Sequence, residues 1–91
     1  MVYDVDFTDI ANEGLLKLKK SDAGAYNKLL RLLEELREHP TTGTGKPEVL
    51  KGDQKGRWSR RITDKHRLVY EINGKEIVVL VISVYGHYDD K

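Results

Sequence analysis

A carboxylate, two guanidinium groups and an imidazole in the second half of the sequence are of the types that phosphodiester chemistry requires. They are Glu48, Arg61, Arg67 and His87, with the phenol of Tyr88 next to the imidazole. Cleavage of an RNA backbone needs cations that hold the phosphate, and an acid–base pair for the 2′-hydroxyl and the departing 5′-oxygen. These residues therefore indicate a nuclease site that needs no cofactor.

The proton transfers cannot be assigned from residue types alone. An ordinary glutamate has a pKa of about 4.3 and an ordinary histidine about 6.5, so glutamate accepts protons readily but is a weak base. Positioning and charge stabilisation would have to supply most of the rate. Whether Glu48 or His87 is the true base is left open by the residues.

The stretch 46–67 is strongly basic, although the 91-residue chain carries a formal net charge of only +1. It holds eight Lys and Arg residues against three acidic ones. This excess favours a site for a polyanion such as RNA. The alternative interpretation is a solvated, charged sheet edge that discourages aggregation between strands.

The amino-terminal half predicts one strand followed by two helices. Apolar and polar residues alternate over 3–7, which is typical of a strand. Apolar residues then recur at helical spacing over 9–20 and over 22–39, with Thr8 as the first cap. Pro40 is expected to end the second helix.

The carboxyl-terminal half predicts three strands, over 57–63, 66–72 and 76–85. Asn73-Gly74 predicts a type I′ turn, so that the last two strands pair antiparallel. The fold class is then α+β, with both helices on one face of a mostly antiparallel four-stranded sheet. Alternation along the strands places Arg61 and Arg67 together on the opposite, open face.

Length and composition set further limits. A chain of 91 residues with 38% hydrophobic residues predicts one folded domain over 1–91. The absence of cysteine excludes disulfides and thiolate sites, and the three widely spaced histidines predict no metal site. The longest apolar run, 77–82, is too short to cross a bilayer, and the basic start of a signal peptide is missing, so a cytoplasmic protein is expected.

Four sequence runs together resemble one family over nearly the whole chain. They are GKPEVLK at 45–51, WSRRI at 58–62, HRLVY at 66–70 and GHY at 86–88. In this order and spacing they resemble the YoeB/Txe toxins of the RelE superfamily, and the RelE-like fold agrees with the one above. The resemblance implies the toxin of a type II toxin–antitoxin pair, an mRNA interferase that cuts the message in the ribosomal A site.

The resemblance also implies a role for each catalytic candidate. The ribose 2′-OH attacks the adjacent phosphate, with Glu48 as general base and His87 as general acid. Arg67 would stabilise the charge on the phosphorane, and Tyr88 would stack on or orient the nucleotide.

Binding roles follow in the same way. Lys51 and Arg61 would hold phosphate or position the nucleotide, and Lys46 and Arg60 are expected to bind RNA beside them. The implied partners are mRNA, the 30S A site and a cognate antitoxin of the YefM/Phd or Axe type. Operator DNA would be contacted only through the antitoxin complex. A homodimer is possible, and no membrane is involved.

Two alternative functions and one departure from the family pattern accompany this interpretation. The chain could be a non-catalytic member that acts by binding an antitoxin with operator DNA, or another target. It could also be a nuclease that needs no ribosome. Some relatives end at the His-Tyr pair, whereas this chain continues with Asp89-Asp90-Lys91, which we expect to project into solvent.

Overall fold

The computed structural model describes residues 2–86 and contains two α-helices and five strands. In chain order the elements are β1 (Asp4–Phe7), α1 (Asp9–Ser21), α2 (Ala23–Leu36), β2 (Glu48–Val49), a short 3₁₀ turn (Gly52–Gln54), β3 (Trp58–Arg61), β4 (Arg67–Asn73) and β5 (Val78–Ser83). None of the helices in the described part is long and apolar enough to traverse a lipid bilayer.

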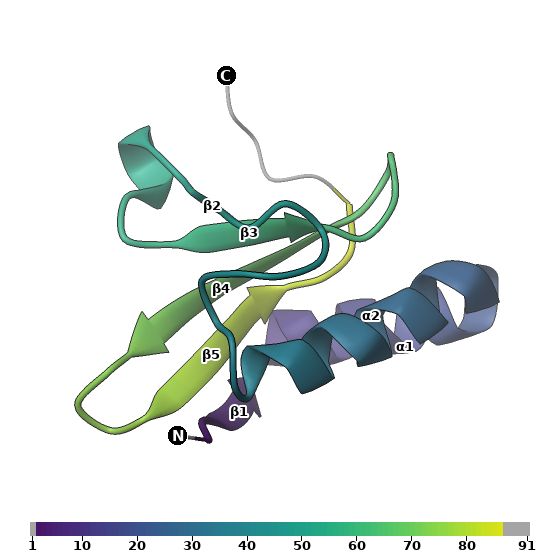
Figure 1. The fold of residues 1–91 in the computed structure, drawn as a ribbon. Coiled ribbons are helices and arrows are strands. Elements are labelled where there is room, and N and C mark those ends of the chain that lie inside the picture. Colours follow the sequence, from purple (N-terminus) through teal and green to yellow (C-terminus); the bar gives the residue numbers. More distant parts are fainter. Residues whose placement is uncertain (1, 87–91) are drawn as a thin grey trace.

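The strands form one sheet in the order β1-β5-β4-β3-β2. β1 runs parallel to β5, and the other neighbours are antiparallel, while both helices cover the same face of the sheet (Figure 1). The α+β class and the one-sided helices are confirmed. The expected number of four strands is wrong, because the two-residue β2 joins the edge of the sheet. A strand of two residues is too short to show an alternating pattern.

Local side-chain bonds explain where the helices begin. The Thr8 hydroxyl accepts a hydrogen bond from the Ala11 N–H (3.0 Å) and donates one to the Ile82 carbonyl (2.7 Å), so it caps α1 and ties it to β5. The Asp22 carboxylate caps α2 in the same way through the Ala25 N–H (3.0 Å). α2 ends at Leu36 rather than at residue 39. Pro40 disfavours helical conformation in the residue directly before it.

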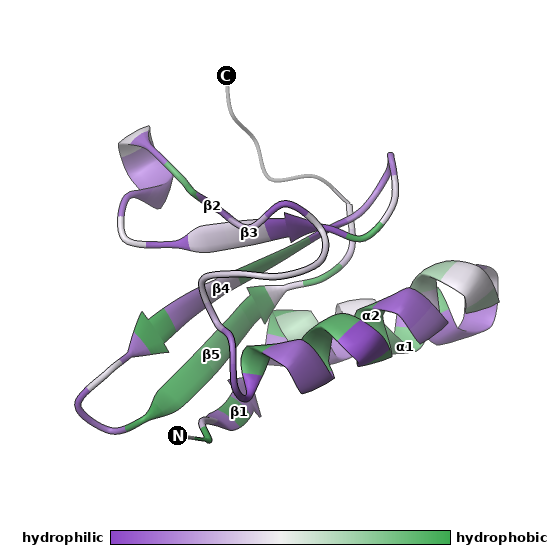
Figure 2. Ribbon diagram, in the orientation of Figure 1, coloured by the Kyte–Doolittle hydropathy of each residue, from purple (hydrophilic) through white to green (hydrophobic). Residues whose placement is uncertain are grey.

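The hydrophobic core lies between the helices and the sheet. The apolar stripes of α1 and α2 meet the inward side chains of β4 and β5, and Figure 2 shows β5 as a largely apolar strand. The fully buried apolar residues include Leu18, Leu29, Leu32, Leu36, Leu68, Val79, Val81 and Val84. Because the apolar residues face the helices, the other face of the sheet can carry charged groups.

The connection between β4 and β5 corrects the expected turn. The strands pair antiparallel as predicted, but Asn73 pairs with Val78, so four residues rather than two form the loop. The Asn73 side-chain oxygen accepts hydrogen bonds from the backbone N–H groups of Lys75 (3.1 Å) and Glu76 (3.0 Å). The positive φ of this loop falls on Ile77 (57°), not on Asn73 or Gly74. The asparagine thus organises the turn with its side chain instead of its backbone.

Candidate active site

Four charged residues surround a small hollow on the face of the sheet away from the helices. The hollow measures about 150 Å³ and is lined by Lys46, Glu48, Arg61 and Arg67. Arg61 of β3 lies directly opposite Arg67 of β4, and Glu48 of β2 lies opposite Ser59 of β3. The predicted convergence of one carboxylate with these two arginines is therefore present.

The contacts inside the hollow fix Arg67 more firmly than its neighbours. One Arg67 guanidinium nitrogen lies 3.5 Å from a Glu48 carboxylate oxygen and donates a hydrogen bond (3.4 Å) to the hydroxyl of the buried Ser59. The Arg67 side chain is 23% exposed, whereas those of Glu48 and Arg61 are 53% and 49% exposed. Among residues 2–86, the Arg61 side chain is paired with Asp64 alone (3.7 Å), and this pair is solvent-exposed. Pairs of this kind contribute about 0–1 kcal/mol, so an incoming phosphate can compete for Arg61.

Lys46 reaches the hollow from a tight turn. Gly45 and Lys46 both have positive φ (84° and 51°), and for lysine this is a sparsely populated conformation. The Gly45 carbonyl accepts a hydrogen bond from the Arg61 N–H (2.7 Å), which fastens the turn to the end of β3. Backbone strain of this kind is often found at functional sites.

Gly45→Ala is expected to destabilise the fold and to distort the hollow. A Cβ at this position would lie 2.8 Å from the Arg61 carbonyl oxygen, in a backbone conformation that alanine rarely adopts. We expect a loss of about 1–3 kcal/mol of unfolding free energy in urea denaturation. Gly56→Ala is the matched control, since Gly56 also has positive φ but its Cβ would meet no atom within 4 Å. Equal losses in the two variants would show that the close approach at Gly45 has no effect.

Arg60 is a correction to the predicted RNA-binding set. Its side chain is fully buried on the helix side of β3, so it cannot reach the hollow. Its guanidinium donates hydrogen bonds to Glu35 (2.9 Å), to the Tyr70 hydroxyl (3.1 Å) and to three carbonyls, those of His39, Thr42 and Thr44. Arg60 therefore fastens the loop after α2 to the sheet and acts in folding rather than in RNA binding.

Electrostatics at this buried arginine support that assignment. Partial burial opposes ionisation of Glu35, but hydrogen bonds from Thr44 and Arg60, with the charge of Arg60, outweigh it and hold the pKa of Glu35 below its ordinary value. Burial raises the pKa of the Tyr70 hydroxyl, an effect that Arg60 only partly offsets. The result is an ionised Glu35 and a neutral Tyr70 around the guanidinium.

The remaining predicted site residues lie away from the hollow or outside the described residues. Lys51 is exposed, at the start of the short 3₁₀ turn, and is not among the residues that line the hollow. His87 and Tyr88 fall outside residues 2–86. The described chain ends beside the site, because the Gly86 carbonyl accepts a hydrogen bond from the Arg67 N–H (3.0 Å).

One contact near the site was not expected from the sequence. His66, predicted simply to begin a strand, accepts a hydrogen bond on Nδ1 from the Gly86 N–H (2.8 Å). The only signal in the sequence is its position next to Arg67. The partner is a backbone N–H, which every residue except proline has, so the residue types do not predict this contact.

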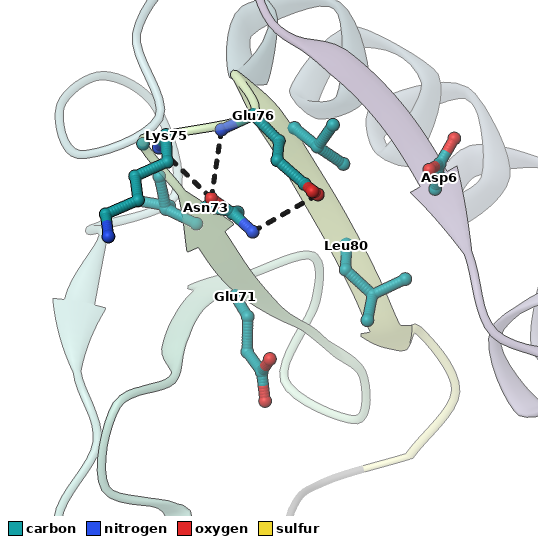
Figure 3. Close-up of a pocket in the computed structure, with 9 residues that line it drawn as sticks. Asp6, Glu71, Asn73, Lys75, Glu76 and Leu80 are labelled. Atoms are coloured by element: carbon teal, nitrogen blue, oxygen red, sulfur yellow. Dashed lines mark hydrogen bonds between the residues drawn. The ribbon is translucent and has the colours of Figure 1, made fainter.

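A second, larger hollow has the wrong charge for RNA. It measures about 650 Å³ and lies at the other end of the same face, against β1, β5 and β4. Figure 3 shows Asp6, Glu71 and Glu76 around it, with Lys75 at its rim. Carboxylates in this number repel a phosphate backbone, so the smaller basic hollow is the candidate active site. Between residues 2 and 86 no group of three His, Asp or Glu side chains is arranged to hold a metal ion.

Comparison with known proteins finds similar toxins. The toxin YoeB of Streptomyces coelicolor is 40% identical over 84 residues, which are 92% of this chain and 98% of the relative. The YoeB/ParE toxin from Agrobacterium tumefaciens has a TM-score of 0.87 at 36% identity, covering 93% of this chain and 99% of that one.

Two Staphylococcus aureus structures also match over 97% of this chain and 100% of theirs. They are a YoeB-YefM complex (TM-score 0.81, 29% identity) and a YoeB dimer (TM-score 0.82, 31% identity). The model of the YoeB-like toxin of bacterial type II toxin-antitoxin systems matches residues 7–88. The resemblance carried by the sequence motifs is confirmed, and the chain belongs to this YoeB-like toxin family.

Proposed function

We propose that this protein is a ribosome-dependent endoribonuclease that cuts mRNA in the A site. The observation that carries the proposal is the pair of guanidinium groups of Arg61 and Arg67, directly opposite each other beside Lys46. Like charges opposite each other on adjacent strands are destabilising. An anion bound between them would relieve the repulsion, and the phosphate of an RNA backbone is such an anion.

The chemistry follows from the lining of the hollow. The ribose 2′-oxygen forms a bond to phosphorus while the bond from phosphorus to the 5′-oxygen breaks, which leaves a cyclic phosphate and a 5′-hydroxyl. Glu48 takes the proton of the 2′-hydroxyl, and Arg67 stabilises the additional negative charge on the phosphorane. Since Glu48 and Arg67 lie 3.5 Å apart, both groups can act on one phosphodiester.

The general acid is assigned to His87 and a nucleotide-orienting role to Tyr88 on the strength of the sequence motif. Both residues follow Gly86, whose carbonyl is bonded to the Arg67 backbone. Consecutive Cα atoms lie about 3.8 Å apart, so the segment that carries His87 starts at the site. Its imidazole would return a proton to the departing 5′-oxygen.

The size of the hollow supports dependence on the ribosome. A space of about 150 Å³ holds a phosphate group but encloses no complete nucleotide. Base and ribose would therefore need another surface to orient them for in-line attack, and the A site can supply it. Lys51, exposed at the edge of the sheet, could contact the same RNA or ribosomal RNA, and the protein would act in the cytoplasm, where translation takes place.

The family relationship supports an antitoxin partner. The Staphylococcus aureus relatives were solved as a complex with YefM and as a dimer. We expect this chain to bind a cognate antitoxin of that type, whose acidic segment would cover the basic hollow and compete with RNA. Operator DNA would be contacted through that complex, and a homodimer is expected for the free toxin.

The decisive test compares programmed ribosomes with naked RNA. Purified protein should cut the message on ribosomes within minutes and leave naked RNA largely intact, with new 3′ ends that carry a cyclic phosphate. Lys55→Ala is the control, since this exposed lysine lies outside the hollow. Equal cutting of both substrates would favour a nuclease that needs no ribosome. Cutting of neither would favour a toxin that acts by binding alone.

A further inference from the structure

Both backbone groups of Gly86, its N–H and its carbonyl, are hydrogen-bonded to two consecutive residues, His66 and Arg67. Its N–H donates to His66 Nδ1 (2.8 Å), and its carbonyl accepts from the Arg67 N–H (3.0 Å). Figure 1 shows the chain turning, after β5, toward the loop that joins β3 to β4. The end of the described chain is thus fastened at the point where the candidate catalytic arginine begins β4.

The residues just before Gly86 are packed closely as well. The rings of Tyr85 and His66 have centroids 4.7 Å apart, and Lys17 of α1 lies 5.2 Å from the Tyr85 ring. A Cβ on Gly14 of α1 would lie 3.0 Å from side-chain atoms of both Val84 and Tyr85. The segment 84–86 therefore packs against α1 and against His66, the residue directly before β4.

The hydrogen bond from Gly86 identifies the acceptor atom of His66. A ring nitrogen that accepts a hydrogen bond uses its lone pair, so Nδ1 is the atom of His66 that holds the Gly86 N–H. His66 is only 8% exposed, which leaves it poorly placed to act on RNA directly. Its Nδ1 atom instead acts as a fixed acceptor for the backbone.

We infer that His66 is a positioning residue, which fixes Gly86 beside Arg67 and thereby fixes the point from which the chain continues to His87. The anchoring rests on described contacts, and its catalytic consequence rests on the proposed function. Gly86 has a φ of +79°, so the chain changes direction at the anchored residue. A small shift there would displace the general acid, and a misplacement of about 1 Å can cost about 100-fold in rate.

Two variants of the full-length protein separate hydrogen bonding from ring packing. His66→Phe keeps a ring against Tyr85 but has no acceptor, whereas His66→Asn keeps an acceptor near the position of Nδ1 but has no ring. The readouts are amide hydrogen exchange at Gly86 and kcat and KM for cleavage on programmed ribosomes. The exposed His39 provides the matched control, His39→Asn.

In His66→Phe we expect Gly86 exchange to rise and kcat to fall about 10- to 100-fold at nearly constant KM. His66→Asn should stay within about threefold of wild type in both readouts, because asparagine keeps an acceptor for the Gly86 N–H. His39→Asn should do the same, because His39 has no part in this bond. Any other pattern at His66, including loss in both variants, overturns the proposal. If the wild-type protein does not cut RNA, the proposed function is wrong. The hydrogen exchange of the Gly86 amide in the variants then tests by itself whether His66 anchors Gly86.

Discussion

Arg60→Ala is expected to lower the free energy of unfolding by about 3–5 kcal/mol, the usual cost of breaking a buried, hydrogen-bonded ion pair. The substitution removes the donor to three loop carbonyls, to Glu35 and to the Tyr70 hydroxyl at once. These acceptors would lose a charged partner whose own side chain is fully buried. A domain of this length has a total stability of about 5–14 kcal/mol, so the loss is a large share of it.

Urea denaturation of Arg60→Ala beside Arg61→Ala gives the cleanest measurement. The two arginines are neighbours, but Arg61 is half exposed, and its removal should change stability by about 1 kcal/mol or less. Because the pKa of Glu35 is lowered in the folded state, its contribution is present above the ordinary pKa of glutamate and is lost as the pH falls through the lowered value. The gap between wild type and Arg60→Ala should therefore narrow in acid. Equal losses for the two arginines would contradict the buried role of Arg60.

Arg67→Ala should reduce cleavage of ribosome-bound message about 100- to 1000-fold, by analogy with the loss of one donor to a developing oxyanion. Arg67 is less exposed than Glu48, with which it forms an ion pair. It lines the hollow in which the phosphorane would form. Its charge matters most when the phosphate gains negative charge in the transition state. The fold should survive, because the pair with the half-exposed Glu48 contributes little to stability.

Single-turnover cleavage on programmed ribosomes measures this effect apart from product release. Arg67→Lys should recover only part of the rate, because lysine keeps the charge but not the planar fork of donors. The urea midpoint of Arg67→Ala should remain close to that of wild type. A cleavage rate within tenfold of wild type for the folded Arg67→Ala protein would remove Arg67 from the catalytic machinery.

The elements of the fold could be predicted because each carries a clear period. The strands and helices were found within a few residues, and alternation placed Arg61 and Arg67 on the open face. The two-residue β2 could not be found, because it exists only through its pairing with β3. The turn at Asn73 also differs, since its side chain competes with the backbone for the same N–H groups.

The parts of the candidate site that are made of charged side chains could be predicted from the sequence. The contacts that involve backbone groups could not. Glu48 and the two arginines were found from the motifs and from alternation. The expectation that Arg60 binds RNA is wrong because the type of a residue does not register its burial. The partners of Arg60 are mostly carbonyls of a loop, and the partner of His66 is a backbone N–H. Sequence patterns contain no record of such groups.

The pairing of the first strand with the last has a consequence for synthesis of the protein. In the sheet that the structure describes, β1 pairs with β5 alone, and the Thr8 side chain donates a hydrogen bond to Ile82, 74 positions later. During translation the amino-terminal strand must wait, unpaired, until almost the whole chain has been made. The complete sheet can therefore form only when translation of the chain is essentially finished, so an antitoxin that is already present can bind the toxin as it folds.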